Sequence, residues 1–85
     1  MSLLDWLGRR DAIATLFYLH DHPGIYRYSI PSEGDRHDRV QEGLKNGLVE
    51  VYNGTKARSM EQLYLTTKGR QVVWTLYDLN KEVRM

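Results

Sequence analysis

The stretch GLVEVYNGTKARSMEQLYLTTKGR, residues 47–70, decides how this 85-residue chain folds. Apolar side chains alternate over residues 48–52 and again over residues 62–65. A period of two is typical of a strand that buries one face. We therefore predict a β-hairpin whose long loop covers residues 53–60.

The register of this hairpin follows from the side chains that share a face. An antiparallel pairing that sets Val51 opposite Leu63 also sets Val49 opposite Leu65. These four side chains then form the buried face, because cross-strand neighbours lie on the same side of a sheet. The outer face carries two tyrosines, Tyr52 and Tyr64.

A helix and a short strand are predicted before the hairpin region. Apolar side chains recur at helical spacing over residues 11–20, where Asp11 is suited to the N-cap position. Pro23 ends this helix, since it has no backbone donor and disfavours the helical conformation of the residue before it. Residues 25–28 are aromatic and alternating, which favours a single edge strand.

A second helix is predicted over residues 35–46. Asp35 is suited to cap its start, and Gly47 is suited to the left-handed position after its end. Val40 and Leu44 lie one helical turn apart and form its inward seam.

The last helix is predicted over residues 67–83, with Thr66 or Thr67 as its cap. Glycine near the start of a helix is unfavourable, so Gly69 indicates a close approach of another backbone. The apolar stripe of this helix is wider than one small sheet can cover. We therefore expect a partner for the rest of it.

Composition excludes several classes of protein. The chain has no cysteine, which rules out disulfides, thiolate zinc sites and cysteine nucleophiles. No apolar run is long enough to span a membrane, and the start does not resemble a signal peptide, so we expect a cytoplasmic protein. His20 and His22 lack a third metal ligand, and no phosphate-binding loop or nucleophile motif is present. We expect no cofactor, no metal and no enzymatic activity.

Two steps in the sequence carry a resemblance to a known family. GLVE, residues 47–50, resembles the step from the recognition helix into the wing of winged helix-turn-helix proteins. YLTTKGR, residues 64–70, resembles their step from the wing into the dimerisation helix. The resemblance covers residues 11–85. It implies an α+β, mostly α, winged helix in one domain over residues 1–85, with a three-helix core, a β-hairpin wing and a long C-terminal helix.

The chain departs from the family pattern at two places. Residues 28–33 leave little room for the first helix of the helix-turn-helix unit, and Gly43 stands where the recognition helix often has a large apolar residue. The resemblance nonetheless implies a transcription regulator that binds double-stranded DNA as a homodimer.

The charges of residues 35–46 give this DNA-binding hypothesis mixed support. With Val40 and Leu44 inward, the outward face is expected to centre on three acids, Asp35, Asp38 and Glu42, flanked by Arg39, Lys45 and Asn46. Arg36 and His37 are expected toward the core side. Acids facing phosphates oppose binding, because affinity for DNA comes mostly from neutralising phosphates.

The expected DNA contacts are nevertheless basic residues. Those that approach the groove are Arg36, His37 and Arg39, and those that contact the backbone are Lys45, Lys56 and Arg58, with Arg27 as a further phosphate contact. The same charges also fit solvated ion pairs along a helix and a solvated loop. An alternative function is therefore a protein-interaction module whose acidic face docks a basic partner and that binds no DNA.

Apolar residues near both ends are expected to form the two-fold interface of a homodimer. They are Leu3, Trp6, Leu7, Val72, Leu76, Leu79 and Val83. Four aromatic residues at helical spacing, Trp6, Tyr18, Trp74 and Tyr77, are read as core or interface in preference to an effector pocket.

Overall fold

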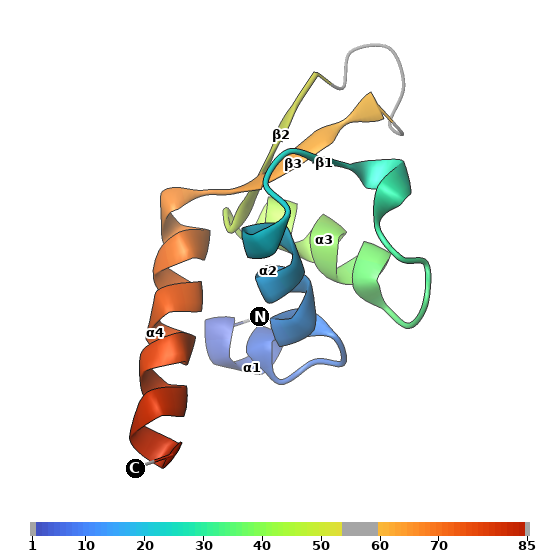
Figure 1. Ribbon diagram of the computed structural model, residues 1–85. Coiled ribbons are helices and arrows are strands. Elements are labelled where there is room, and N and C mark those ends of the chain that lie inside the picture. The colour runs from blue at the N-terminus through green and yellow to red at the C-terminus, as the bar shows by residue number, and fades with distance from the viewer. Residues whose placement is uncertain (1, 54–59, 85) are drawn as a thin grey trace.

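The computed structural model describes residues 2–53 and 60–84, with the side chains of the last helix described as far as residue 81. Short helices and strands precede one long helix (Figure 1). In chain order the elements are α1 (Leu3–Leu7), α2 (Ala12–Asp21), β1 (Ile25–Tyr26), the 3-10 turn η1 (Arg27–Ser29), α3 (Arg36–Lys45), β2 (Val49–Tyr52), β3 (Gln62–Leu65) and α4 (Thr67–Arg84).

The three strands form one antiparallel sheet in the order β1-β3-β2. Its register confirms the predicted hairpin, because Val51 pairs with Leu63 and Val49 pairs with Leu65. The rings of Tyr52 and Tyr64 meet edge to face, with centroids 5.3 Å apart.

β1 is shorter than the predicted strand over residues 25–28, because the chain turns into η1 at Arg27. This single 3-10 turn is all the helical structure between β1 and α3. It confirms that the region holds little room for a regular helix.

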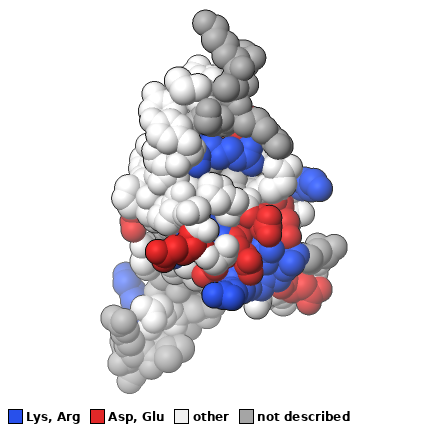
Figure 2. Space-filling view, turned by 90° about the vertical axis from the view of Figure 1, so that its right-hand side faces the viewer, with Lys and Arg blue, Asp and Glu red and all other residues white. Residues whose placement is uncertain are grey.

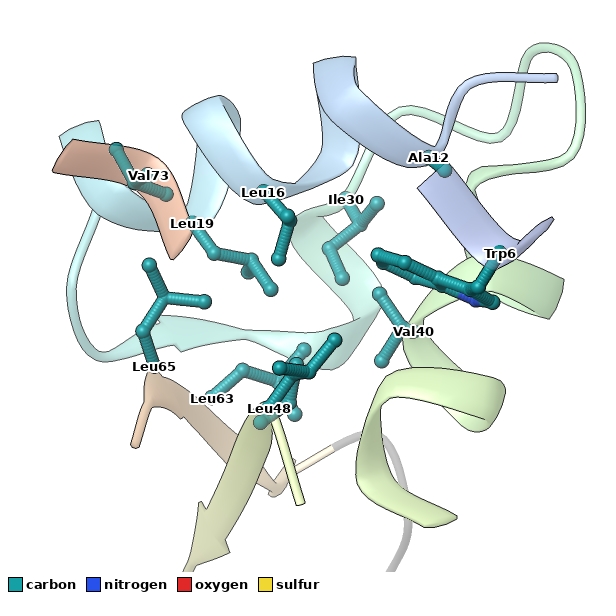
Figure 3. Packing of buried hydrophobic residues seen from close by; sticks show 11 residues of the cluster. Trp6, Ala12, Leu16, Leu19, Ile30, Val40, Leu48, Leu63, Leu65 and Val73 are labelled. Carbon is teal, nitrogen blue, oxygen red and sulfur yellow. The ribbon is translucent and has the colours of Figure 1, made fainter. Parts of the chain in front are cut away.

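The helices lie on one side of the sheet, as Figure 1 shows. α2 and α3 lie below the hairpin, and α4 runs along one side of the molecule to the C-terminus at the far end from the hairpin. The core lies between these elements and takes side chains from all the helices and from β2 and β3 (Figure 3). Its members are Trp6, Ala12, Leu16, Leu19, Ile30, Val40, Leu48, Val49, Leu63, Leu65 and Val73.

The junction between the hairpin and α4 confirms two predictions. Thr66 caps α4, because its Oγ1 accepts a hydrogen bond from the backbone N–H of Gly69 at 3.1 Å. Gly69 is close to another backbone, since a Cβ at this position would overlap the carbonyl oxygen of Leu48. The glycine is required there because α4 begins directly against the start of β2.

Asp11 differs from its predicted role. It occupies the N-cap position of α2, but its φ of 64° is left-handed and its side chain does not cap that helix. Instead its Oδ2 accepts a hydrogen bond from the backbone N–H of Asp35 at 2.9 Å. The carboxylate therefore joins the start of α2 to the start of α3, a contact between residues far apart in the sequence. Among the described residues, no helix is both long enough and apolar enough to cross a bilayer.

Candidate nucleic-acid interface

The exposure of side chains along α3 defines its inward and outward faces. Arg39, Val40 and Gly43 are buried, whereas His37 and Lys45 are exposed. The inward direction is thus rotated from the predicted Val40–Leu44 seam toward Arg39. Gly43 permits this rotation because it has no side chain, and Val49 of β2 occupies the space beside it.

This rotation changes which residues α3 presents outward. His37, Gln41 and Lys45 follow one another at intervals of four residues and form a row along the outward side, which we call the α3 row. The prediction that His37 lies toward the core was wrong, since its side chain is exposed. Gln41 was missed by the charge-based prediction, although its spacing from the other two would have indicated it.

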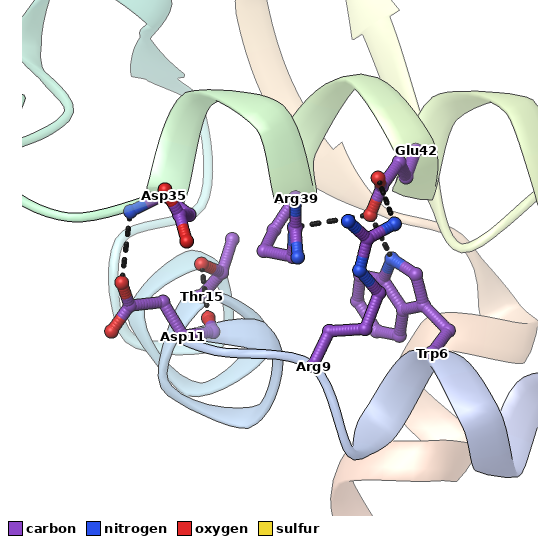
Figure 4. Close-up of polar contacts among 7 residues, drawn as sticks. All are labelled: Trp6, Arg9, Asp11, Thr15, Asp35, Arg39 and Glu42. Carbon is purple, nitrogen blue, oxygen red and sulfur yellow. Dashed lines mark hydrogen bonds and ion pairs between the residues drawn. The ribbon is translucent and has the colours of Figure 1, made fainter.

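The predicted acidic face is also wrong in two of its three residues. Asp38 is exposed, but Asp35 and Glu42 are partly buried. Glu42 points toward α1 and the turn after it (Figure 4). Its Oε1 accepts a hydrogen bond from the indole N–H of Trp6 at 2.9 Å, and its Oε2 accepts one from Nη1 of Arg9 at 2.6 Å.

Arg39 is buried beside the partly buried Glu42 and does not flank the outward face. Its exposed fraction is 4%, and its Nε lies 3.0 Å from Oε1 of Glu42. The two charges form an ion pair, but the Nε–H does not point at the oxygen and makes no hydrogen bond. A buried guanidinium with this partner is a structural ion pair, and its predicted approach to a DNA groove has no support in this geometry.

Arg27 is similarly engaged inside the fold. Its side chain is 14% exposed and donates from Nη1 to Oε2 of Glu61 and from Nη2 to Oε1 of Gln41, the latter at 2.9 Å. Its backbone N–H also donates to the carbonyl of Glu61 at 2.8 Å. Arg27 therefore ties the base of the hairpin to α3, and it is not the free phosphate contact that was expected.

The other predicted DNA contacts lie in different surroundings. Arg36 is partly buried and donates from Nη1 to the carbonyl of Glu33 at 3.1 Å. Lys45 is exposed near the end of α3. Lys56 and Arg58 lie outside the described residues, so their predicted contacts remain predictions.

Charge on this side of the molecule is balanced. Figure 2 shows basic and acidic side chains side by side on the viewed face, with no large area of one sign. The segment from Arg27 to Lys45 holds four basic residues, Arg27, Arg36, Arg39 and Lys45, and four acidic residues, Glu33, Asp35, Asp38 and Glu42. Any attraction of this segment to DNA must therefore come from how its charges are oriented.

The outer face of the hairpin carries a phenol beside a carboxylate. The negative charge of Glu50 raises the pKa of Tyr52 above its ordinary value, because a second negative charge nearby is unfavourable. Tyr52 therefore stays neutral at physiological pH and presents a hydroxyl donor.

An apolar groove of about 310 Å³ lies between α1 and α4. Its lining includes five of the predicted interface residues, Leu3, Leu7, Val72, Leu76 and Leu79, together with Leu4, Lys68, Gln71 and Thr75. Trp6 does not belong to this surface. It is fully buried and is part of the core, so its predicted place in the interface was wrong. The side chain of Val83 lies outside those that the structure describes.

Known structures share this arrangement of elements. A possible HxlR family transcriptional factor from Thermoplasma volcanium superposes with a TM-score of 0.73 over 99% of this chain and 80% of its own, at 23% identity. The fold is a winged helix. The G34K variant of MepR from S. aureus gives a TM-score of 0.76 over 96% of this chain, at 18% identity.

The winged-helix chain is shorter than the MepR chains. It spans 65% of the G34K variant and 64% of a second MepR variant, from a multidrug-resistant clinical isolate, whose TM-score is 0.73 at 18% identity. No family model and no curated protein matches the sequence. The solved structures nevertheless confirm, at the level of the fold, the resemblance proposed from residues 47–50 and 64–70.

Proposed function

We propose that this winged-helix protein is a cytoplasmic transcription regulator that binds double-stranded DNA and has no catalytic role. The observation that carries the proposal is the orientation of α3. Glu42 is turned inward to Arg9 and Arg39, so its charge is compensated within the protein. Of the three acids expected to face outward, only Asp38 is exposed.

The α3 row has the chemistry of a major-groove surface. A recognition helix places outward side chains against base edges, while basic residues near it contact phosphates. His37 and Gln41 can hydrogen-bond to bases, and Lys45 can neutralise a phosphate. Lys56 and Arg58 are proposed to add backbone contacts from the hairpin loop.

We further propose that the protein acts as a homodimer through the groove between α1 and α4. The shape and chemistry of this surface support a two-fold contact, because its lining includes the exposed leucines Leu4 and Leu79. Among the residues that the structure describes, Lys68 is the one charged residue in its lining. A near absence of charge is typical of the centre of a protein interface. Two recognition helices would then lie about 34 Å apart, one turn of DNA.

Fluorescence anisotropy with a labelled duplex at several salt concentrations tests DNA binding. We expect binding that weakens steeply with salt. Lys45→Ala should weaken binding and reduce the salt slope by about one, as for the loss of a single phosphate contact. Lys81→Ala is the matched control, since Lys81 is also an exposed helical lysine but lies on α4. Absence of binding at low salt contradicts the proposal.

Sedimentation velocity over a range of protein concentrations tests the dimer. We expect a concentration-dependent dimer that Leu4→Glu disrupts without unfolding the chain, because Leu4 is 81% exposed. A wild-type chain that stays monomeric at the highest concentration contradicts the dimer and leaves the DNA-binding proposal to its own test.

The balanced charge of the Arg27–Lys45 segment supports a second candidate function. A surface with basic and acidic groups side by side suits a protein partner better than a polyanion. In that case the exposed side of α3 docks a protein, and no salt-dependent binding of duplex DNA is expected.

A further inference from the structure

Gln41 occupies the centre of the α3 row and has a fixed neighbour. It lies one helical turn from His37 on one side and one turn from Lys45 on the other. Unlike these two it is partly buried, because its side chain reaches η1 and meets Arg27 there. The middle residue of the row is therefore held in place, while both its neighbours are exposed.

The chemistry of Arg27 determines which way the Gln41 amide points. A guanidinium carries only donors, so it can bind only the oxygen end of an amide. Nη2 of Arg27 accordingly donates to Oε1 of Gln41 at 2.9 Å. Nε2 of Gln41 makes no hydrogen bond to any described residue. The amide oxygen thus uses one of its two lone pairs on Arg27, and within the described part of the chain neither N–H donor has a partner.

Arg27 is itself held from two directions. Its Nη1 donates to the Glu61 carboxylate, and its backbone N–H donates to the Glu61 carbonyl. Both charged side chains are mostly buried, and a charge-assisted hydrogen bond is stronger than a neutral one. The orientation of the Gln41 amide is therefore set before any ligand arrives.

We propose that Gln41 is a specificity-determining residue that selects guanine at one base pair of each half-site. The inference rests on the proposed function. The major-groove edge of guanine offers two acceptors, N7 and O6, and no donor, which complements an amide that presents only N–H groups. Adenine recognition by glutamine requires the amide oxygen to accept from the adenine amino group. Here Arg27 already uses one of the two lone pairs of that oxygen and holds the oxygen against η1, which disfavours the two-bond adenine mode.

Selection from a pool of random duplexes, followed by sequencing, tests this inference. The 85-residue chain is expected to enrich guanine at one position per half-site. Gln41→Ala should lower the enrichment of guanine at that position by about fivefold or more. The base preferences at the other positions should not change. Folding of both proteins is compared by circular dichroism, so that loss of preference is separated from loss of structure.

A second variant tests the role of Arg27. Arg27→Lys keeps a positive charge for Glu61, but its single ammonium nitrogen cannot take the places of both Nη1 at Glu61 and Nη2 at Gln41. The freed amide can then bind adenine in the two-bond mode, and the preference at that position should move from guanine toward adenine. Arg10→Lys is the control, because Arg10 is 76% exposed and touches neither residue.

The outcomes separate this inference from the proposed function. Duplex binding with no guanine preference that depends on Gln41 overturns the inference alone. Retention of an unchanged guanine preference in Arg27→Lys overturns the role of the Arg27 contact. Absence of any duplex binding overturns the proposed function, and the inference with it.

Discussion

The helices α3 and α4 break the usual rule of apolar side chains inside and charged side chains outside in two different ways. α3 buries a charged residue, Arg39, and that residue has the carboxylate of Glu42 beside it. α4 exposes three large apolar residues, Trp74, Tyr77 and Leu79. A buried charge can be compensated by a neighbour within the same chain. An exposed apolar surface can be removed from water only by another molecule.

The two tryptophans give the largest expected contrast between these regions. Trp6 is 0% exposed beneath α3, whereas Trp74 on α4 is 57% exposed. Trp6→Ala should lower the free energy of unfolding by about 3–5 kcal/mol, because it opens a cavity in the core. Trp74→Ala should change it by no more than about 0.5 kcal/mol.

Urea unfolding in dilute solution, where any dimer is dissociated, measures both tryptophan variants. Similar losses for the two would show that α4 is covered within the monomer, and the contrast between the helices would then be incorrect.

A glycine in each helix gives a smaller contrast. Gly69→Ala in α4 forces a methyl group against the Leu48 carbonyl and should cost about 1–3 kcal/mol of stability. In α3, a Cβ at Gly43 would lie 2.9 Å from Cγ2 of the buried Val49, a side chain that must shift but is not fixed backbone. Alanine also favours the helix by about 1 kcal/mol over glycine. Gly43→Ala should therefore cost less than Gly69→Ala.

Thermal unfolding of the two alanine variants provides the measurement for the glycines. A Gly43→Ala variant less stable than Gly69→Ala would show that the packing of β2 on α3 is tighter than the contact at the start of α4.

The helix caps give the smallest contrast. Thr66→Ala removes a side-chain hydrogen bond at the start of α4 and should cost about 1 kcal/mol. Asp35 makes no such bond at the start of α3. Asp35→Ala should lose only the favourable interaction of its charge with the helix dipole, which salt screens. Denaturation at low and high salt distinguishes them, since only the loss at Asp35 should shrink with salt.

Much of the fold could be predicted because its signals are local. The alternation of residues 48–52 and 62–65 determines both the hairpin and its register, since a slip by one residue would turn every apolar side chain outward. Thr66 and Gly69 likewise mark the start of α4 through short-range backbone chemistry. Asp11 was placed correctly at the start of α2, but its side-chain partner was not local and could not be predicted.

The candidate site was predicted less well, because it depends on the rotation of α3 about its own axis. The hydropathy of Val40 and Leu44 alone was used to predict which face of α3 points inward. Burial of Arg39 and the small volume of Gly43 shift that direction, which turns Glu42 inward and brings Gln41 into the outward row. Hydropathy patterns treat arginine as exposed and glycine as neutral, so they cannot predict this rotation of α3.

The amino-acid sequence by itself determined the order of the elements from α2 onward, the pairing of the hairpin strands and the close contact at Gly69, because each follows from periodicity or from the conformational limits of single residues. Tertiary structure decided which face of α3 meets solvent and which hydrogen bonds Arg27 makes. Those features require side chains from distant segments, such as Glu61 and Gln41, to meet, and only the packed chain brings them together.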